Sequence, residues 1–278
     1  MSKTSTSERR LPFTSPATVP RQRLVAFSWV SLLLVLASFT TPPIPELRGP
    51  NNLPSSKTGW GEYLPPLLNG ITVVNKAISG RSARSYTNEG RFTELTNLVK
   101  SGDIVVIEFG HNDGGSPNSA SDNGRSDCPG TGPEVCISGK TGEKVYTFNY
   151  YVETAAKALI AKGASVIFSS QTPNNVWEGG SYGGYGTPVR FVGYAAQASR
   201  NLASTGRASF VDHYQAVAKM YLKLGSQKTN SLYPSDHTHT SPEGADLVAK
   251  AFAQAVKLSW NGTTPLKAFL KAGNQDVF

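Results

Sequence analysis

Asp103-Ile104-Val105-Val106-Ile107-Glu108-Phe109-Gly110 is a mostly apolar stretch, rich in β-branched residues, that ends in a glycine and is followed by His111-Asn112-Asp113. An apolar run of this length is typical of a strand that is buried on both faces of a sheet. Similar short runs alternate with segments whose apolar residues recur at helical spacing. The strand-like runs are 71–79, 164–170 and 209–212, and the helix-like segments are 92–100, 150–162, 189–203, 214–224 and 241–258. This alternation predicts an α/β fold, in which helices cover both faces of a parallel sheet.

Polar clusters follow three of the predicted strands at the point where each strand ends. They are Ser79-Gly80-Arg81-Ser82, Gly110-His111-Asn112-Asp113 and Gln171-Thr172-Pro173-Asn174-Asn175. In an open parallel sheet, ligands bind outside the carboxyl ends of the strands. The backbone N–H of Gly80 and the side-chain amide of Asn112 are suitable donors for the oxyanion of an acyl-transfer reaction. Each residue also has a simpler interpretation, because glycine permits a turn with positive φ and asparagine commonly occupies turns and helix caps.

A carboxylate and an imidazole lie three residues apart late in the chain, in Ser235-Asp236-His237-Thr238-His239-Thr240. An aspartate at this spacing can hold the Nδ1–H of His239 and leave Nε2 to accept a proton from a nucleophile. The alternative is a helix entrance, in which Asp236 caps a turn and Thr240 or Ser241 is the N-cap of the next helix. The convergence of this pair with the strand-end donors favours the catalytic interpretation.

Five blocks of sequence follow one another in a fixed order. They are Gly59-Trp60-Gly61-Glu62-Tyr63, Ala77-Ile78-Ser79-Gly80-Arg81-Ser82-Ala83-Arg84-Ser85, Glu108-Phe109-Gly110-His111-Asn112-Asp113-Gly114-Gly115, Ser170-Gln171-Thr172-Pro173-Asn174-Asn175 and Asp236-His237-Thr238-His239-Thr240-Ser241-Pro242. Together they resemble the fungal rhamnogalacturonan acetylesterases of the SGNH (GDSL-like) hydrolase superfamily. The resemblance covers roughly Gly59 to Leu258, and so many ordered blocks are far more specific than any single motif.

The resemblance implies a three-layer, flavodoxin-like fold and the removal of acetyl groups from pectic rhamnogalacturonan. It also implies a role for individual residues of this sequence. Gly80 and Asn112 would be the oxyanion donors, Asp236 the orienting acid and His239 the general base.

The nucleophile of the family is not identifiable in this chain. Family members begin with a strand that ends in Gly-Asp-Ser, and this sequence contains no Gly-Asp-Ser. The upstream serines that could replace it lack both a preceding glycine and a strand-turn-helix context. These serines are Ser28, Ser31, Ser38, Ser55 and Ser56. Ser181, in Gly-Gly-Ser-Tyr-Gly, satisfies the literal G-x-S-x-G pattern, but no predicted strand precedes it and we interpret this segment as a loop.

The missing block also predicts a gap in the sheet. In the flavodoxin-like order 2-1-3-4-5 the first strand is central, so without it two neighbouring strands have unmade ladder hydrogen bonds. Each buried unpaired group costs roughly 1–3 kcal/mol, and a whole strand of them rivals the ~5–15 kcal/mol that stabilises a domain. Either residues 24–36 supply a replacement strand, or the chain is unstable, or its N-terminus is a faulty gene model. We favour the last explanation, because the rest of the match is intact.

The first 48 residues differ in composition from the remainder. They hold six of the 27 Lys and Arg residues and two of the 19 acids, and Leu24–Phe39 is an uncharged apolar run. The run is shorter than the ~20 residues that span a bilayer, and it suits the apolar part of a signal peptide, with a membrane anchor as the alternative. We therefore expect a targeting or disordered segment over 1–48, a hydrolase-like domain over 49–262 and a C-terminal tail over 263–278.

Charge and cysteine content limit the partners and cofactors. The net charge is +8, but beyond residue 48 there is no basic stripe of the kind that binds nucleic acid. Two cysteines and four scattered histidines form no metal-binding pattern, so we expect neither a metal nor a cofactor. The resemblance implies a disulfide between Cys128 and Cys136, and Asn261-Gly262-Thr263 is an N-glycosylation sequon. Both features suit a secreted monomer that contacts a membrane only if residues 24–39 are an anchor.

The function expected from the sequence is a carbohydrate O-acetylesterase that acts on pectic rhamnogalacturonan or a similar acetylated polysaccharide. A serine would attack the acetyl carbonyl and His239 would accept its proton. Because the serine is not identifiable, the alternative is a catalytically inactive relative that retains the sugar groove as a binding module.

Overall fold

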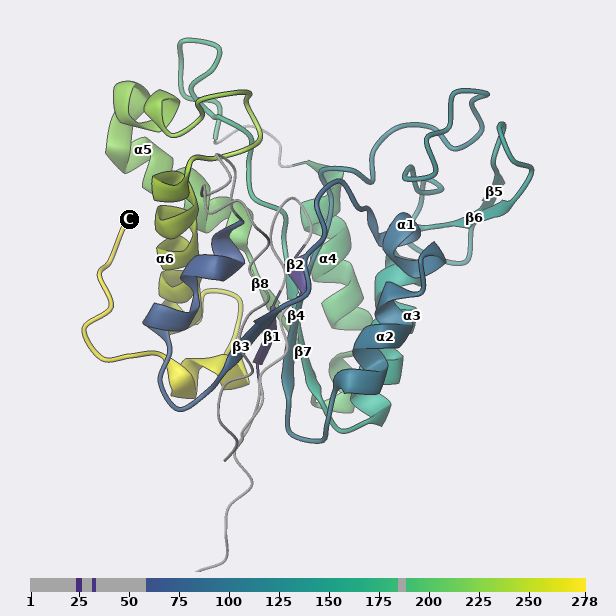
Figure 1. Ribbon diagram of the computed structural model, residues 1–278, viewed down its shortest axis with the longest axis horizontal. Helices are drawn as coiled ribbons and strands as arrows, with labels where there is room; N and C mark the ends of the chain where they lie inside the picture. The colour runs from purple at the N-terminus through teal and green to yellow at the C-terminus, as the bar shows by residue number, and fades with distance from the viewer. Residues whose placement is uncertain (1–23, 27–31, 34–58, 185–188) are drawn as a thin grey trace, which may run out of the picture.

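The computed structural model describes residues 24–26, 32–33, 59–184 and 189–278. A parallel sheet runs through its centre in the strand order β3-β1-β4-β7-β8 (Figure 1). Its strands are β1 (Leu24–Ala26), β3 (Val73–Asn75), β4 (Ile104–Glu108), β7 (Ser165–Ser169) and β8 (Ala208–Val211). A short strand, β2 (Leu32–Leu33), pairs antiparallel with the end of β4. This is the 2-1-3-4-5 order, so the predicted α/β fold with a parallel sheet is confirmed.

The strand β1 lies at the position where the sequence predicts a gap. Leu24 is opposite Val73 of β3 on one side and Ile104 of β4 on the other, and both pairings are parallel. The apolar run therefore supplies a replacement for the central strand, and the ladder is made along β1. Of the first 48 residues, the structure describes only β1 and β2. The expectation of a signal peptide or an anchor therefore concerns residues that lie mostly outside the described ranges.

Helices cover both faces of the sheet, as Figure 1 shows. On one face α5 (His213–Ser231) packs against α6 (Pro242–Leu258), and α6 packs against the short 3-10 helix η1 (Trp60–Tyr63). The helices of the other face are α1 (Ala83–Asn88), α2 (Arg91–Leu98), α3 (Phe148–Ala161) and α4 (Arg190–Asn201). Between the two layers, the apolar residues Ile104–Ile107 of β4 are at most 2% exposed, which explains the uninterrupted apolar pattern of that strand.

The helix predicted over 214–224 is longer than expected. It begins at His213 and reaches Ser231, with a kink at Gly225, whose φ of 74° lies in the left-handed region that favours glycine. Three other 3-10 helices are η2 (Pro65–Leu67), η3 (Ala203–Thr205) and η4 (Pro265–Phe269).

The C-terminal segment 263–278 packs onto the domain. The carbonyl of Phe269 accepts a hydrogen bond from Asn69 N at 2.8 Å, and Lys271 N donates to Leu67 O at 3.0 Å. Leu266 is fully buried, and the side chain of Gln254 accepts from the last two backbone N–H groups. This segment therefore covers part of the α6 side of the molecule.

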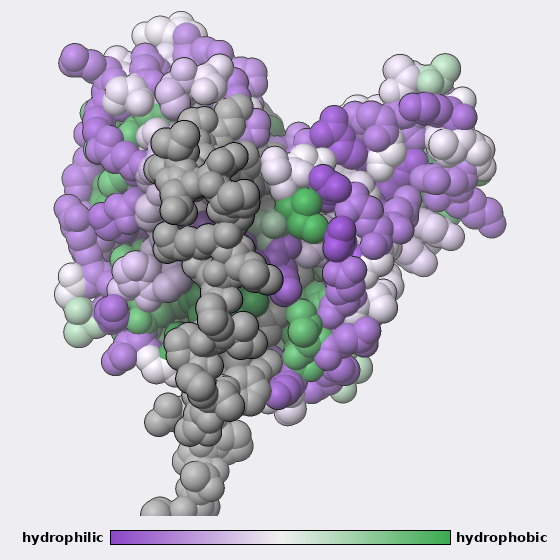
Figure 2. All heavy atoms as spheres, viewed as in Figure 1, coloured by the Kyte–Doolittle hydropathy of each residue, from purple (hydrophilic) through white to green (hydrophobic). Residues whose placement is uncertain are grey.

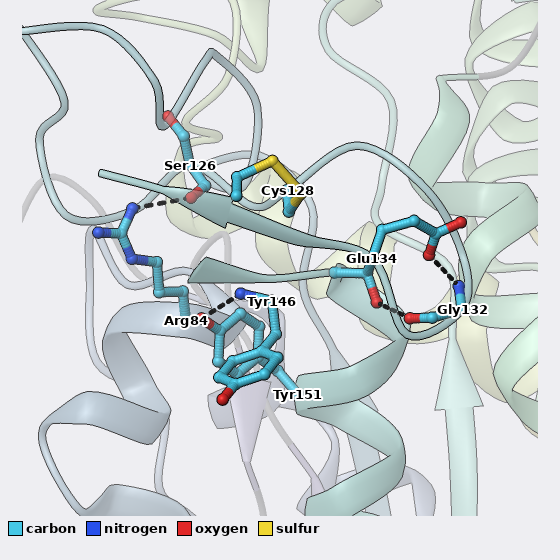
Figure 3. Close-up of a disulfide and its surroundings, with 9 residues drawn as sticks. Arg84, Ser126, Cys128, Gly132, Glu134, Tyr146 and Tyr151 are labelled. Carbon is cyan, nitrogen blue, oxygen red and sulfur yellow. Dashed lines mark hydrogen bonds between the residues drawn. A yellow bond between two sulfur atoms is a disulfide. The ribbon is translucent and has the colours of Figure 1, made fainter. Parts of the chain in front are cut away.

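A lobe between β4 and α3 rises beside the sheet at the upper right of Figure 1. It contains the hairpin of β5 (Val135–Ile137) and β6 (Lys144–Tyr146), and a disulfide joins Cys128 to Cys136 of that hairpin (Figure 3). The fully buried Arg84 of α1 reaches into the lobe, where it donates to Asp122 and to the carbonyl of Ser126 and pairs with Glu143. In the space-filling view the lobe stands across a hollow from the α5 side of the molecule (Figure 2).

In the described ranges, no helix has the combination of length and apolar character that is needed to cross a bilayer.

Candidate active site

The loop before α6 places the predicted carboxylate and imidazole in contact. The Nδ1 atom of His239 lies 2.8 Å from Oδ2 and 3.0 Å from Oδ1 of Asp236. The same carboxylate accepts the backbone N–H groups of Thr238 at 2.9 Å and His239 at 2.7 Å. Because a carboxylate accepts hydrogen bonds, Nδ1 carries the proton and Nε2, on the opposite edge of the ring, is the unprotonated nitrogen of the neutral imidazole.

Both interpretations of this loop describe part of the geometry. Asp236 holds the imidazole and also caps the turn through its backbone hydrogen bonds. Ser241 is the N-cap of α6, where its Oγ accepts from Gly244 N at 3.2 Å, and Pro242 is the first helical residue. The turn and the cap together fix the backbone on both sides of His239.

The loops after β3 and β4 bring Gly80 and Asn112 together. The Nδ2 atom of Asn112 donates to Arg81 O at 3.3 Å, and its Oδ1 accepts from Arg125 Nη1 at 2.9 Å. The same arginine nitrogen donates to Gly80 O at 3.3 Å. These contacts fix which way the amide of Asn112 points. The φ of Gly80 is 74°, so the backbone that presents its N–H lies in the left-handed region.

Asp113 joins the two loops by its carboxylate. Its Oδ1 accepts from Ala83 N at 2.7 Å, and its Oδ2 accepts from Gly110 N at 2.9 Å. A Cβ on Gly110 would lie 2.0 Å from the side-chain oxygen of Gln171, so only glycine fits at this turn. The Gly80 loop and the Asn112 loop are therefore held at a fixed separation by a bridge inside the protein.

A second buried carboxyl group, that of Asp127, lies against Asp113. Burial raises the pKa of Asp113 to about 7, and burial with the neighbouring carboxylate raises the pKa of Asp127 well above its usual range. No donor from the described part of the chain reaches either oxygen of Asp127, whereas Asp113 accepts two N–H groups. Asp113 is therefore the member that ionises first, and Asp127 keeps the proton that it donates to Asp113.

His111 lies near the loop that carries Asp236 and His239. Its Nε2 is 3.3 Å from Thr172 Oγ1. Burial first, with the nearby His239 and His237, lowers the pKa of His111 to about 4. The loop before α6 is therefore close enough to the end of β4 for its histidines to affect His111. His111 is neutral at physiological pH, so it adds no positive charge beside His239.

The loop after β7 completes the rim of the site. Asn175 N donates to His237 O at 2.8 Å, and Thr238 Oγ1 donates to Asn174 Oδ1 at 3.1 Å. A cavity of about 410 Å³ opens beside this contact. Its lining includes Gln171, Asn174, Glu178, Ser181 and Tyr214.

The predicted serines are not placed in a nucleophile elbow by the described residues. Ser181 lies in a loop of turns between β7 and α4, without a strand directly before it. Ser28, Ser31, Ser38, Ser55 and Ser56 lie outside the described residues. The pairing of Asp236 with His239 and the approach of Gly80 to Asn112 are therefore the parts of the predicted site that the structure brings together.

Sequence reasoning assigned no role to Asp113, Arg125 and Asp127. Asp113 directly follows Asn112, and that position at a strand end was the only available signal. Arg125 and Asp127 come from a long loop without periodicity, so no sequence pattern pointed to them.

The buried His213 belongs to a polar cluster around Glu108, the last residue of β4. The carboxylate of Glu108 accepts from Trp60 Nε1 at 3.0 Å and Ser169 Oγ at 2.6 Å, and it lies 2.8 Å from His213 Nδ1. His213 Nε2 is 3.0 Å from the carbonyl of Val248 and donates to it. Both ring nitrogens of His213 are thus engaged, which makes it a structural residue. Among the described residues, no group of three His, Cys, Asp or Glu side chains is arranged to hold a metal ion.

Comparisons with known proteins show the family of this chain. The rhamnogalacturonan acetylesterase of Emericella nidulans is 49% identical over 215 residues, which cover 77% of this chain and 84% of that protein. A probable rhamnogalacturonan acetylesterase of Bacillus subtilis, YesY, is 24% identical over 209 residues, covering 73% of this chain and 85% of that protein. The crystal structure of YxiM from Bacillus subtilis shares the fold with a TM-score of 0.53 and 22% identity, over 74% of this chain and 51% of that one.

Residues 44–247 match the GDSL-like lipase/acylhydrolase family. The matched range contains the strand-end loops of Gly80 and Asn112 and the pair of Asp236 and His239. With this match over most of its length and a relative that shares almost half of the aligned residues, the chain belongs to the GDSL-like lipase/acylhydrolase family.

Proposed function

We propose that this protein is a carbohydrate O-acetylesterase that removes acetyl groups from rhamnogalacturonan or a similar acetylated polysaccharide. The observation that carries the proposal is the 2.8 Å contact between Asp236 and Nδ1 of His239, which leaves Nε2 as a base. The name of the Emericella nidulans relative supports the substrate class.

The residues suit acyl transfer in two steps. Nε2 of His239 accepts the proton of a serine hydroxyl while the serine oxygen attacks the acetyl carbonyl. The carbonyl oxygen becomes an oxyanion, which accepts hydrogen bonds from Gly80 N–H and Asn112 Nδ2. The tetrahedral species then expels the sugar oxygen, which takes the proton from His239. Water, activated by the same base, attacks the acetyl-serine and releases acetate.

Ser28 is the first serine to test as the nucleophile. It follows the last residue of β1 by two positions in the sequence, and the family carries its serine directly after the corresponding strand. The surroundings differ from the family pattern, because Ala26-Phe27 precedes Ser28 in place of Gly-Asp. Ser181 is the matched control, since it satisfies a nucleophile motif without a strand before it.

The experiment uses the full chain with acetylated rhamnogalacturonan and a fluorophosphonate probe. We expect acetate release and covalent labelling, and we expect both to disappear in Ser28→Ala and His239→Ala and to persist in Ser181→Ala. Labelling that is lost only in Ser181→Ala would move the nucleophile to that loop. A folded chain that neither releases acetate nor reacts with the probe would refute the hydrolase and favour the sugar-binding alternative.

We further propose that the protein is a secreted monomer that takes part in pectin degradation. The disulfide between Cys128 and Cys136 supports an oxidising compartment. Asn261 is exposed, and its Oδ1 accepts from Asp212 N at 3.1 Å, so the nitrogen that would carry a glycan is not used in that bond. Mass spectrometry of the exported protein before and after glycosidase treatment tests the glycan at this site.

A further inference from the structure

Arg125 contacts both of the residues that are proposed as oxyanion donors, Gly80 and Asn112. Its Nη1 donates to Asn112 Oδ1 at 2.9 Å and to Gly80 O at 3.3 Å. A Cβ built on Gly80 would lie 3.9 Å from the same nitrogen. The side chain is only partly buried, so the guanidinium is held in place and still meets solvent.

Neither of these contacts neutralises the charge of the guanidinium. Both acceptors are neutral oxygens, and among the described residues no carboxylate forms an ion pair with Arg125. A guanidinium has five N–H donors, and Nη1 accounts for two of them. The edge formed by Nε and Nη2 therefore has no acceptor among the described residues. That edge is the planar fork that matches the two oxygens of a carboxylate.

The acidic residues of the surrounding lobe are all engaged elsewhere. Asp122 and Glu143 bind the buried Arg84. Asp113 accepts from two backbone N–H groups and has Asp127 against it, and Glu134 accepts from a backbone N–H at 2.8 Å. The lobe thus contains five acids, and none of them pairs with Arg125.

We propose that Arg125 selects an acidic polysaccharide, because its Nε–Nη2 edge binds the carboxylate of a uronic acid unit at or next to the acetylated unit. The inference rests on the proposed function, since the acetyl carbonyl is taken to lie on Gly80 and Asn112. Because Nη1 contacts both of those loops, a carboxylate on the opposite edge belongs to the same stretch of substrate. A neutral acetylated polysaccharide has no carboxylate for the Nε–Nη2 edge of Arg125, so water would remain bound there.

Binding measurements test the inference without any need for hydrolysis. The ligand is a de-acetylated rhamnogalacturonan oligosaccharide, compared with the same oligosaccharide after its carboxyl groups have been reduced to alcohols. Calorimetric titration of the full chain should give about fivefold tighter binding of the acidic form, equivalent to about 1 kcal/mol. The contrast should shrink as salt is added, because the contact is partly exposed.

Two variants assign the contrast to one residue. Arg125→Gln should bind both oligosaccharides equally. Arg207→Gln is the matched control, because Arg207 is exposed, donates to Gly163 O at 2.8 Å and lies just before β8, at the opposite end of the sheet. It removes the same charge and should keep the contrast. Equal binding of the two oligosaccharides by the unmodified chain, or an unchanged contrast in Arg125→Gln, would overturn the inference.

A measurement on the unmodified chain covers the case in which Arg125→Gln does not fold. The Nε–Hε signal of Arg125 in a nitrogen-15 spectrum, assigned with Arg125→Lys, should shift with the acidic oligosaccharide and stay in place with the reduced one. A signal that ignores both ligands would refute the contact. A chain that shows the contrast but releases no acetate would refute only the hydrolase, and an active chain without the contrast would refute only the role of Arg125.

Discussion

The buried pair of Asp113 and Asp127 should make the unfolding free energy of the protein depend on pH. Burial raises the pKa of both carboxyl groups, that of Asp113 from 3.8 to about 7. Between these values the folded protein holds a proton that the unfolded chain has released. Stability falls as pH rises wherever the folded state binds more protons, so both carboxyl groups stabilise fully below about pH 4; Asp113 loses its contribution as pH rises to about 7, and Asp127 loses its contribution at higher pH.

The size of the effect follows from the burial of the pair. Asp113 is 0% exposed and Asp127 is 2% exposed, so solvent screens neither group strongly. A shift of roughly three pKa units corresponds to about 4 kcal/mol across the whole window. One proton of difference changes the unfolding free energy by about 1.4 kcal/mol per pH unit, or about 2 kcal/mol between pH ~5 and pH ~6.5.

Asp127→Asn removes one of the two titrating protons, that of residue 127, and keeps the shape of the side chain. The amide donates to Asp113 at every pH, so the unfolding free energy of the variant should depend less steeply on pH than that of the unmodified protein. Urea unfolding at several pH values measures the difference, which amounts to a relative shift of about 1 M in midpoint for a slope of about 2 kcal/mol/M. Asp276→Asn, at an exposed ion pair with Lys257, is the control and should leave the pH dependence unchanged. Equal slopes for Asp127→Asn and the unmodified chain would refute the shared proton.

Three further substitutions test the site and its supports. Asn112→Ala should lower acetate release by about 10²–10³-fold with an unchanged melting temperature, because it removes one oxyanion donor. Arg84→Met should cost about 3–5 kcal/mol in urea unfolding, because it leaves a buried carboxylate unpaired, whereas Arg91→Met, at an exposed ion pair, should stay within about 0.5 kcal/mol. Replacing Cys128 and Cys136 together by serine should cost at most about 2.5 kcal/mol, the loop-closure value for so short a loop, and should speed proteolysis of the lobe.

The sequence predicted those parts of the molecule that depend on local pattern. The buried strand Ile104–Glu108 has an uninterrupted apolar run because both of its faces are covered, and α6 has a clear apolar face behind its Ser-Pro start. The contact of Asp236 with His239 was predictable because three residues of one turn separate them. The approach of Gly80 to Asn112 followed from the rule that the ends of parallel strands share an edge.

Other features depend on contacts between distant segments and leave no local signal. Arg125 reaches Asn112 from a loop without periodicity, and Asp127 meets Asp113 only after that loop has folded back. The replacement strand β1 was ambiguous for a different reason. A three-residue strand inside a longer apolar run has the same composition as the core of a signal peptide, so composition could not separate the two.

The position of β1 has a consequence for the maturation of the protein. Among the described strands β3 pairs with β1 alone, so Leu24–Ala26 attach β3 and the Gly80 loop behind it to the rest of the sheet. A processing enzyme that cuts behind Ala26 would discard this attachment, and one that cuts ahead of Leu24 would retain it. The same residues cannot be both a removed leader and a permanent strand. An exported form with this fold therefore has its first residue at or before Leu24, which N-terminal sequencing of the exported protein reads directly.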